Sequence, residues 1–456
     1  MSYDLVVIGG GAGGLGAARA GIRLGKRTVM VQDGRIGGDC TFTGCVPSKT
    51  LIEAASQGRT FEQAMAKLNE VVERIAATEN FDVLKSEGID VIEGRASFSG
   101  TRALSVGNTV IRADRIVIAT GSSAVLPPIS GLRQIPYLTN ENVFKITYLP
   151  SSLIVLGGGA IGCELAQVFG RFGTKVHILE GTQRLLPREE PEASATVAEA
   201  LRREGITLHL GVKVIGVEPS LTGHGIRVSL ANGSSIDGEE LLVAVGRRPV
   251  TDGLAPEEGG VALDEHGYIK TDPYLRTTSK GVYAVGDVTG RLPFTHAADE
   301  MGRIAVRNGF RRLRRDEFNT SAIPWVTFTD PEVARVGITE SEAAASGAQV
   351  AYLPMASVDR AVMSGRTEGF VKLIAAPRPL LRNTGGGRLV GATIVCPRAG
   401  EMVHEIALAI RTNMFTGRLA QTVHAYPSWS TSIRQAAAQF FFDLDGYGAR
   451  KAKVSD

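Results

Sequence analysis

Two segments of the chain carry the same pattern, a short apolar run followed by glycines at G-x-G-x-x-G spacing. The apolar runs cover 5–8 and 153–156, and each glycine turn leads into an Ala-containing stretch typical of a helix. In such a turn the first glycine closes the strand, the second lets the backbone approach a pyrophosphate, and the third lets helix and strand pack closely. One match alone is weak evidence, but two predict a pair of α/β dinucleotide-binding units, with the glycines Gly9, Gly11 and Gly14 in the first and Gly157, Gly159 and Gly162 in the second.

The residue that ends the second strand of each unit is expected to face an adenosine ribose. Gln32 and Glu180 each lie 23 residues after the first glycine of their unit. An acidic side chain there accepts hydrogen bonds from ribose hydroxyls, and an amide can do so without a charge. The carboxylate of Glu180 would repel the 2′-phosphate of NADPH, and no arginine directly follows it. We therefore predict that the second dinucleotide-binding pattern, with Gly157 and Glu180, binds NADH in preference to NADPH.

Two of the four cysteines, Cys40 and Cys45, lie five positions apart just after the first of these units begins. A structural disulfide framework needs more cysteines and an oxidising compartment, and a zinc site needs a second ligand pair at a usable spacing. Lys49 lies one helical turn after Cys45, and a nearby ammonium favours the reactive thiolate. The pattern predicts a redox-active pair with Lys49 beside it and no resident metal; two buried structural cysteines are the alternative.

Length and charge limit the remaining classes of protein. A chain of 456 residues is long enough for two to four domains. A net charge of +3, from 50 basic and 47 acidic side chains, provides no basic field that would attract nucleic acid. No apolar run approaches the ~20 residues of a membrane span, and no basic segment of a secretion signal precedes the first strand. We expect a cytoplasmic protein without nucleic-acid or membrane partners.

Further short segments extend the pattern over essentially the whole chain. They are an A-T-G sequence that contains Thr120 and Gly121, a G-R-x-P sequence that begins at Gly246, the dipeptide Gly286-Asp287, and the stretch 325–332. Together with a redox cysteine pair and two dinucleotide-binding patterns, these segments resemble the class I pyridine nucleotide–disulfide oxidoreductase family. Its mercuric reductase-like and dihydrolipoamide dehydrogenase-like members are the most similar.

The resemblance implies an α/β chain with Rossmann-like FAD- and NAD(P)-binding domains and a C-terminal α+β dimerisation domain that makes a homodimer. We expect the FAD domain at 1–150, the NAD(P) domain at 151–269, a central segment that completes the FAD domain at 270–322, and the interface domain at 323–456. Within the interface domain, 404–413 has the pattern of an amphipathic helix, and 377–387 that of a long hairpin loop between two strands.

The resemblance also implies roles for individual residues. Cys45 would lie against the flavin, and Cys40 would meet the substrate. Lys49 would lie beside the flavin and pair with Glu164 from the nucleotide-domain helix. Electrons would pass from NADH through FAD to the Cys40–Cys45 disulfide. The cofactor sites would further include Thr120, Gly121, Gly246, Gly286 and Asp287, the last as a partner of the ribityl chain.

One C-terminal segment departs from the small-disulfide reductases of this family, which carry a histidine general base there and a glutamate that orients it. Here Tyr426 occupies the histidine position, and Thr431 occupies the glutamate position. A tyrosine, with a reference pKa near ~10, is a poor base at neutral pH. His424 or a water molecule would have to replace the base.

These features predict an FAD-dependent NAD(P)H oxidoreductase that resembles mercuric reductase and uses a Cys40–Cys45 disulfide. Its acceptor is left open between a thiophilic metal, a disulfide and a quinone. Mercuric reductases carry a C-terminal cysteine pair, whereas no cysteine follows Cys396 here, so we do not expect mercury detoxification. The alternatives are dihydrolipoamide dehydrogenase or another small-disulfide reductase, and a non-catalytic flavoprotein that senses redox state.

Overall fold

The computed structural model describes residues 1–220, 225–311, 313, 315–378, 380, 382–444 and 446–454. The chain forms two compact units, each built from separate stretches of sequence. The first comprises Met1–Pro128, Tyr137–Leu149 and Val243–Asn319, and the second comprises Ile129–Pro136, Pro150–Leu242 and Thr320–Asp456. The predicted domain boundaries stay predictions. Within the described part of the chain, no helix is both long and apolar enough to cross a bilayer.

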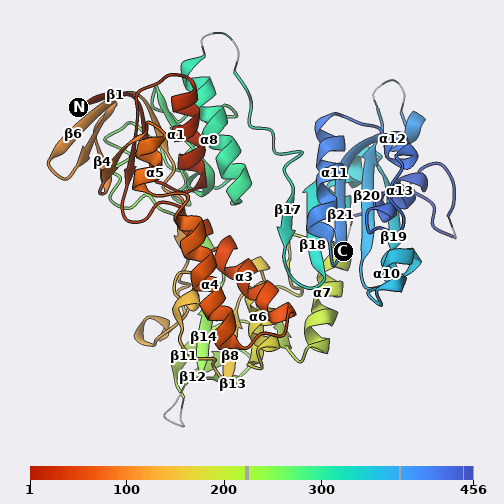
Figure 1. Cartoon of the computed structure of the whole chain (residues 1–456). Helices are drawn as coiled ribbons and strands as arrows, with labels where there is room; N and C mark the ends of the chain where they lie inside the picture. Colours follow the sequence, from red (N-terminus) through yellow and green to blue (C-terminus); the bar gives the residue numbers. More distant parts are fainter. Residues whose placement is uncertain are drawn as a thin grey trace. The chain divides into compact units, whose positions relative to one another are not determined.

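A mixed sheet forms the first unit, in the strand order β3-β2-β1-β6-β5-β4, with β16 also paired to β6. The strands β1, β2, β3, β6 and β16 pair in parallel, whereas β4 and β5 join antiparallel. Helices α1 and α8 lie side by side (Figure 1). The strands are β1 (Ser2–Ile8), β2 (Thr28–Gln32), β3 (Asp90–Glu93), β4 (Ala96–Gly100), β5 (Ala103–Val106), β6 (Thr109–Ile118), β7 (Ser122–Ala124), β15 (Arg247–Pro249) and β16 (Val282–Ala284). The helices are α1 (Ala12–Arg23), α2 (Gly38–Phe42), α3 (Cys45–Ser56), α4 (Phe61–Ala76), α5 (Phe81–Ser86) and α8 (Thr295–Phe310), with the 3-10 turns η2 (Val143–Lys145) and η3 (Gly286–Thr289).

Apolar burial holds this sheet together. Leu5, Val6 and Val7 of β1 have no exposed surface, and Ile116 and Ile118 of β6 beside them are equally buried. Each fully buried aliphatic side chain contributes roughly 1.5–3 kcal/mol. Parallel strands are covered on both faces, so they appear in the sequence as unbroken apolar runs.

The stretch Pro150–Leu242 of the second unit contains strands of a four-stranded sheet in the order β10-β9-β8-β14, in which β8, β9 and β10 pair in parallel. The succession β8–α6–β9 repeats the succession β1–α1–β2 of the first unit. A smaller antiparallel sheet follows, in the order β11-β12-β13. The elements are η1 (Leu132–Gln134), β8 (Ser152–Leu156), α6 (Ala160–Arg171), β9 (Lys175–Glu180), α7 (Pro191–Arg203), β10 (Thr207–Leu210), β11 (Val214–Pro219), β12 (Ile226–Leu230), β13 (Ser235–Gly238) and β14 (Glu240–Val243).

The C-terminal part of the second unit is a six-stranded antiparallel sheet in the order β17-β18-β21-β20-β19-β22. Helix α11 packs against β18 and β21, and α13 packs against β19 and β20 (Figure 1). The elements are β17 (Trp325–Thr327), β18 (Glu332–Gly337), α9 (Glu340–Ala343), η4 (Ala344–Ser346), β19 (Gln349–Pro354), η5 (Met355–Ser357), α10 (Asp359–Met363), β20 (Phe370–Ala376), η6 (Thr384–Gly386), β21 (Arg388–Cys396), α11 (Ala399–Arg411), α12 (Thr416–Gln421), α13 (Thr431–Ala438) and β22 (Arg450–Lys451).

Two expectations for this region can be compared with the structure. The predicted hairpin is confirmed, because β20 and β21 pair antiparallel on either side of 377–387; Pro379 and Leu381 of that loop lie outside the described residues. The predicted helix at 404–413 is part of α11, which begins earlier and ends at Arg411. Asn413 has a left-handed φ of +54°, which an α-helix cannot continue through.

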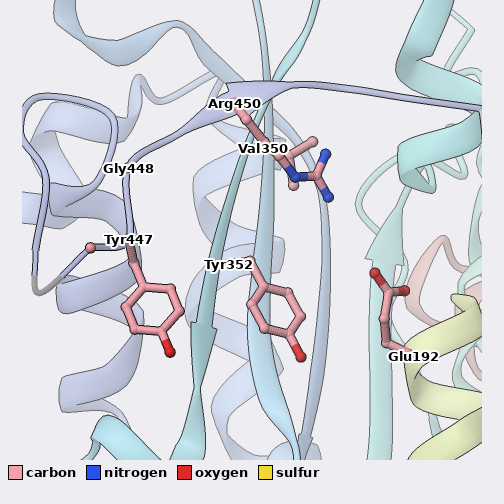
Figure 2. Close-up of a pocket in the computed structure, with 7 residues that line it drawn as sticks. Glu192, Val350, Tyr352, Tyr447, Gly448 and Arg450 are labelled. Carbon is pink, nitrogen blue, oxygen red and sulfur yellow. The ribbon is translucent and has the colours of Figure 1, made fainter.

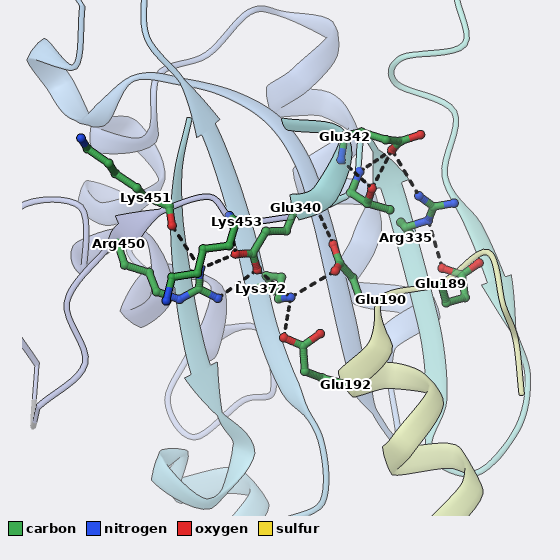
Figure 3. Close-up of polar contacts among 11 residues, drawn as sticks. Glu189, Glu190, Glu192, Arg335, Glu340, Glu342, Lys372, Arg450, Lys451 and Lys453 are labelled. Atoms are coloured by element: carbon green, nitrogen blue, oxygen red, sulfur yellow. Dashed lines mark hydrogen bonds and ion pairs between the residues drawn. The ribbon is translucent and has the colours of Figure 1, made fainter. Parts of the chain in front are cut away.

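A buried ion cluster joins the start of α7 to the C-terminal sheet (Figure 3). The Nζ of Lys372, a side chain only 1% exposed, lies 3.1 Å from Glu190, 2.7 Å from Glu192 and 3.0 Å from Glu340. Arg450 bonds both carboxylate oxygens of Glu340, so three carboxylates share two cations. Because an unpaired buried charge costs several kcal/mol, these groups hold one another in place. An open cavity of about 300 Å³ borders the cluster and is lined by Glu192, Val350, Tyr352, Gly446, Tyr447, Gly448 and Arg450 (Figure 2).

Candidate functional site

The turn between β1 and α1 has the backbone geometry of a phosphate-binding loop. Gly9 has a φ of +103°, and a Cβ there would lie 2.4 Å from the carbonyl oxygen of Ala119. A Cβ on Gly14 would lie 1.8 Å from the carbonyl oxygen of Gly9, so only glycine lets α1 approach this closely. Gly11 precedes the helix, and no described side chain caps its first N–H groups. Those N–H groups are therefore available to an anion.

Gln32 closes this turn from the end of β2. Its Oε1 accepts a hydrogen bond from the N–H of Gly10 at 2.6 Å. Its Nε2 donates to the carbonyl oxygens of Asp33, at 2.9 Å, and Arg35, at 3.1 Å. The amide is held at both ends beside the glycine turn.

Buried hydroxyl groups without partners lie just beyond the end of β6. The Oγ1 of Thr120 and the Oγ of Ser123 are buried and have no hydrogen-bond partner among the described residues. Such groups are normally paired, so these two indicate a place where a ligand completes the bonding. Gly121 and Gly286 both have a φ of +73°, and Ser122 donates to Oδ2 of Asp287 at 2.6 Å.

The structure brings Cys40 of α2 and Cys45 of α3 into contact. The bond to Cys45 is the largest cause of a strongly raised pKa of the Cys40 thiol, and burial adds to it. Sγ of Cys45 lies 3.6 Å from the hydroxyl of Thr295, at the start of α8. The raised pKa favours the thiol form of Cys40, and the Thr295 hydroxyl is placed to donate to Cys45. Lys49 lies one turn further along α3.

A charged link beside the cysteines was not predicted from the sequence. Arg247 of β15 bonds the carboxylate of Asp39 through Nη2. Its Nε and Nη2 also donate to the hydroxyl and carbonyl oxygens of Ser122, each at 2.7 Å. The only signals were that Asp39 directly precedes Cys40 and that Arg247 follows Gly246, whose φ is +144°. Neither signal shows that the two charges meet.

The turn between β8 and α6 repeats the first glycine turn. Gly157 has a φ of +106°, and a Cβ on Gly162 would lie 2.0 Å from the carbonyl oxygen of Gly157. A Cβ on Gly159 would meet no atom within 4 Å, so this side of the turn is open to a ligand. Glu180 accepts hydrogen bonds from the N–H groups of Gly158, at 2.6 Å, and Thr182, at 2.7 Å.

Glu164 of α6 is 5% exposed, and its Oε1 accepts a hydrogen bond from the N–H of Phe328 at 2.8 Å. It therefore anchors the chain just after β17. Its predicted pairing with Lys49 would join residues of the two separate units, and it stays a prediction.

Both candidate bases in the C-terminal segment are bonded to carboxylates. The hydroxyl of Tyr426 donates to Asp359 at 2.9 Å, and this bond raises the pKa of the phenol. His424 is 8% exposed, with Nε2 3.0 Å from a carboxylate oxygen of Glu405 and Nδ1 3.1 Å from the carbonyl oxygen of Thr422. Both ring nitrogens of His424 thus face acceptor oxygens. Within the described residues, Thr431 bonds two neutral groups, the hydroxyl of Ser428 and the carbonyl oxygen of Ala425.

The sequence is similar to those of one known protein family. Residues 3–302 match the family described as pyridine nucleotide-disulphide oxidoreductase, and 323–437 match the dimerisation domain of that family. The chain belongs to the pyridine nucleotide-disulphide oxidoreductases. This oxidoreductase is 35% identical to a mercuric reductase of Streptomyces lividans over 97% of both chains. It is 33% identical to a dihydrolipoyl dehydrogenase of Thermus scotoductus over 96% of this chain and 97% of that one.

The fold of the oxidoreductase is also similar to a solved structure. The HOCl-induced flavoprotein disulfide reductase RclA from Escherichia coli superimposes with a TM-score of 0.87 at 32% identity, over 96% of this chain and 99% of that one. The predicted fold class, enzyme class and use of FAD with a pyridine nucleotide are confirmed. The dimerisation domain supports a homodimer.

The first glycine turn and the residues near it fit FAD. The uncapped start of α1 can bind a pyrophosphate. The buried hydroxyls of Thr120 and Ser123, which have no partner among the described residues, can form hydrogen bonds with the cofactor. The second glycine turn, with Glu180, fits a pyridine nucleotide in the same way. The roles of the individual residues stay predictions. No group of three or more His, Cys, Asp or Glu that could hold a metal ion occurs among the residues that the structure describes.

Proposed function

We propose that this oxidoreductase takes electrons from NADH and delivers them, through Cys40 and Cys45, to a thiophilic metal ion. The observation that carries the proposal is the contact between the two thiols, with the hydroxyl of Thr295 3.6 Å from Sγ of Cys45. The names of similar proteins support a soft metal as acceptor. Several are called mercuric reductase, and a second structure of RclA is described as a Cu(II) complex.

FAD, when bound, supplies the two-electron exchange between NADH and the cysteine pair. The residues of the chain supply position and charge. The hydroxyl of Thr295 lies where it can donate to Cys45 and so stabilise a thiolate. When the pair of one thiol and one thiolate closes to a disulfide, it releases two electrons and the single proton of Cys40.

The C-terminal segment favours a metal ion over a small disulfide as the acceptor. Reduction of a small disulfide requires a group that returns a proton to the departing thiolate, and such catalysis typically supplies ~10²–10⁴ in rate. The hydroxyl of Tyr426 is bonded to Asp359 and the ring of His424 to Glu405, so both side chains are already engaged by carboxylates instead of facing a substrate. Delivery of electrons to a metal ion needs no such group.

The second glycine turn supports NADH as the donor. Glu180 is fixed by two backbone N–H groups, and its carboxylate would repel a 2′-phosphate. Arg184, the nearest cation along the chain, donates instead to the carbonyl oxygen of Pro187 at 2.9 Å. It is therefore not placed to receive that phosphate.

The proposal is tested by steady-state reduction of Hg(II), Cu(II), lipoamide and glutathione disulfide with NADH under anaerobic conditions. We expect at least one metal ion to turn over ~10²-fold faster than either disulfide. Cys40→Ser and Cys45→Ser should each abolish metal reduction. Cys396→Ala, at a buried cysteine of the C-terminal sheet, is the matched control and should retain it. Faster turnover of lipoamide or glutathione disulfide than of any metal ion would overturn the proposal.

A further inference from the structure

Arg247 is shared between two carboxylates that face it from different elements of the first unit. Its Nη2 bonds Asp39 of α2, and its Nε lies 3.8 Å from Asp287 of η3. Ser122 of β7 lies between them, since it accepts from Nε of Arg247 and donates to Asp287 at 2.6 Å. The side chain of Arg247 is 20% exposed, so bulk water screens its charge less than that of a surface arginine.

The link ends at the cysteine pair on one side and at the predicted flavin site on the other. Asp39 directly precedes Cys40 in the five-residue helix α2, and it also accepts from the hydroxyl of Thr43 at 3.2 Å. Asp287 belongs to the dipeptide Gly286-Asp287, for which the family resemblance predicts a contact with the ribityl chain of FAD. Arg247 is one cation against two anions, so this group of three carries a net negative charge, and one of its members directly precedes Cys40 in the chain.

That charge acts on the reduced cysteines more strongly than on the disulfide. The reduced pair carries a thiolate on Cys45, whereas the disulfide carries no charge. Glu79 already raises the pKa of the Cys40 thiol further by its charge. Glu79 thus disfavours negative charge at the cysteine pair. A carboxylate at Asp39 without its cation would do the same, and would therefore make the Cys40–Cys45 disulfide harder to reduce.

We propose that Arg247 is a positioning residue that sets how readily the Cys40–Cys45 disulfide is reduced. It neutralises Asp39 beside the pair and ties α2 to the strand and turn that carry Ser122 and Asp287. This inference rests on the proposed redox role of the cysteine pair.

The test measures a redox equilibrium rather than turnover. The FAD-loaded protein is equilibrated anaerobically in buffers of glutathione and glutathione disulfide, quenched in acid and alkylated, and the Cys40–Cys45 disulfide is quantified by mass spectrometry. In this exchange two glutathione thiols become glutathione disulfide, while the protein disulfide becomes one thiol, one thiolate and a released proton. The variants are Arg247→Ala, Arg247→Lys, Asp39→Asn and the double variant Arg247→Ala with Asp39→Asn. Asp33→Asn, at an exposed carboxylate outside the link, is the control.

The expected shifts have opposite signs, which a merely structural role would not produce. Arg247→Ala should make the disulfide about tenfold harder to reduce, which corresponds to ~30 mV for a two-electron couple. Asp39→Asn should make it easier to reduce, the double variant should return toward the parent, and Arg247→Lys should fall between parent and alanine. Asp33→Asn should have no effect.

Three outcomes decide the matter. If Arg247→Ala and Asp39→Asn shift the equilibrium in the same direction, or not at all, this inference is overturned while the proposed function stands. If the unmodified protein forms no Cys40–Cys45 disulfide in any buffer, both are overturned. If Arg247→Ala loses FAD or does not fold, the opposite sign expected for Asp39→Asn still decides, because that variant keeps the arginine and its bonds to Ser122.

Discussion

The two glycine turns have almost the same backbone but differ in the side chain that closes them. Gly9 and Gly157 have φ values of +103° and +106°, and the third glycine of each turn lies against the first one's carbonyl oxygen. In the first turn an amide, Gln32, accepts from one backbone N–H and donates to two carbonyl oxygens. In the second a carboxylate, Glu180, accepts from two backbone N–H groups.

This difference separates what the fold requires from what the ligand requires. Both turns need an acceptor for the N–H of the residue that follows the first glycine, Gly10 or Gly158, and an amide or a carboxylate oxygen satisfies that need equally. Only the carboxylate adds a negative charge, which would disfavour a 2′-phosphate if Glu180 faces the ribose as predicted. The backbone geometry thus fits a dinucleotide, and under the proposed function the charge of Glu180 selects NADH.

The largest expected effect comes from breaking each turn in the same way. Gly14→Ala and Gly162→Ala each place a Cβ within 2.0 Å of a backbone oxygen, which the packed helix cannot accommodate. We expect Gly14→Ala to be purified without FAD and Gly162→Ala to retain FAD but lose binding of NADH. Flavin absorbance and NADH titration measure the two losses separately.

The matched controls are the middle positions of the same turns. A Cβ on Gly159 meets no atom within 4 Å, and one on Gly11 meets its nearest atom at 3.8 Å. Gly11→Ala and Gly159→Ala should therefore keep the thermal stability of the parent, whatever they do to affinity. Loss of FAD from Gly162→Ala as complete as from Gly14→Ala would contradict the independence of the two sites.

The same comparison shows what a sequence can predict. The glycines, the strand ends and the positions of Gln32 and Glu180 follow local rules of spacing, so they could be placed from the sequence. Thr295 and Arg247 could not, because they are separated along the chain from Cys45 by 250 residues and from Asp39 by 208 residues. Such contacts depend on how distant elements pack, and a single sequence carries no local signal for them. The end of α11 at Arg411 was missed because it depends on the backbone conformation of Asn413.

The segments of the chain that follow the two closing side chains also differ. After Gln32 the chain enters the cysteine helix α2, whereas after Glu180 it enters the ion cluster of Lys372, in which Glu340 is 5% exposed. Burial opposes ionisation of Glu340, but hydrogen bonds from Arg450 and Lys372 outweigh it and lower the pKa of this carboxyl from 4.5 to about 2. Stability from Glu340 is therefore complete above about pH 4.5 and is lost as the pH falls toward 2, by about 3 kcal/mol in all.

Denaturant unfolding at pH 5, 4 and 3 checks this expectation. Both tryptophans, Trp325 and Trp429, lie in the second unit, so their fluorescence reports on that unit alone, while flavin absorbance reports on the first. In Glu340→Gln the free energy of unfolding should fall less steeply below pH 4.5 than in the parent. Glu342→Gln, at a 61% exposed carboxylate on the same short helix, should show the same pH dependence as the parent. Burial raises the pKa of Glu332 to about 6, so its effect on stability has the opposite sign. The free energy of unfolding that the protonated Glu332 contributes is lost as the pH rises from 4.5 to 6. An acid transition that is unchanged in Glu340→Gln would exclude this role for the cluster.

A third prediction reverses the charge at the second turn. Glu180→Arg removes the repulsion and offers a guanidinium to the 2′-phosphate, so the ratio of kcat/KM for NADH over NADPH should fall by about 10²-fold, or ~2.7 kcal/mol. Glu199→Arg, at an exposed position of α7, makes the same change in net charge and should leave the ratio unaltered. Equal use of NADH and NADPH by the unmodified protein would remove the argument from Glu180.

The smallest expected effect comes from exchanging the two closing side chains. In Gln32→Glu one oxygen still accepts from Gly10, but the other oxygen faces the carbonyl oxygens of Asp33 and Arg35, so two hydrogen bonds become repulsive contacts. In Glu180→Gln one oxygen still accepts from Gly158, and the NH₂ group faces a single N–H, that of Thr182. We expect a loss of about 1–3 kcal/mol for the first exchange and about 1 kcal/mol for the second. The temperature of flavin release measures the first loss, and the thermal stability of the second unit, followed by tryptophan fluorescence, measures the second. A larger loss from Glu180→Gln than from Gln32→Glu would show that the charge of Glu180, and not the number of hydrogen bonds, stabilises the second turn.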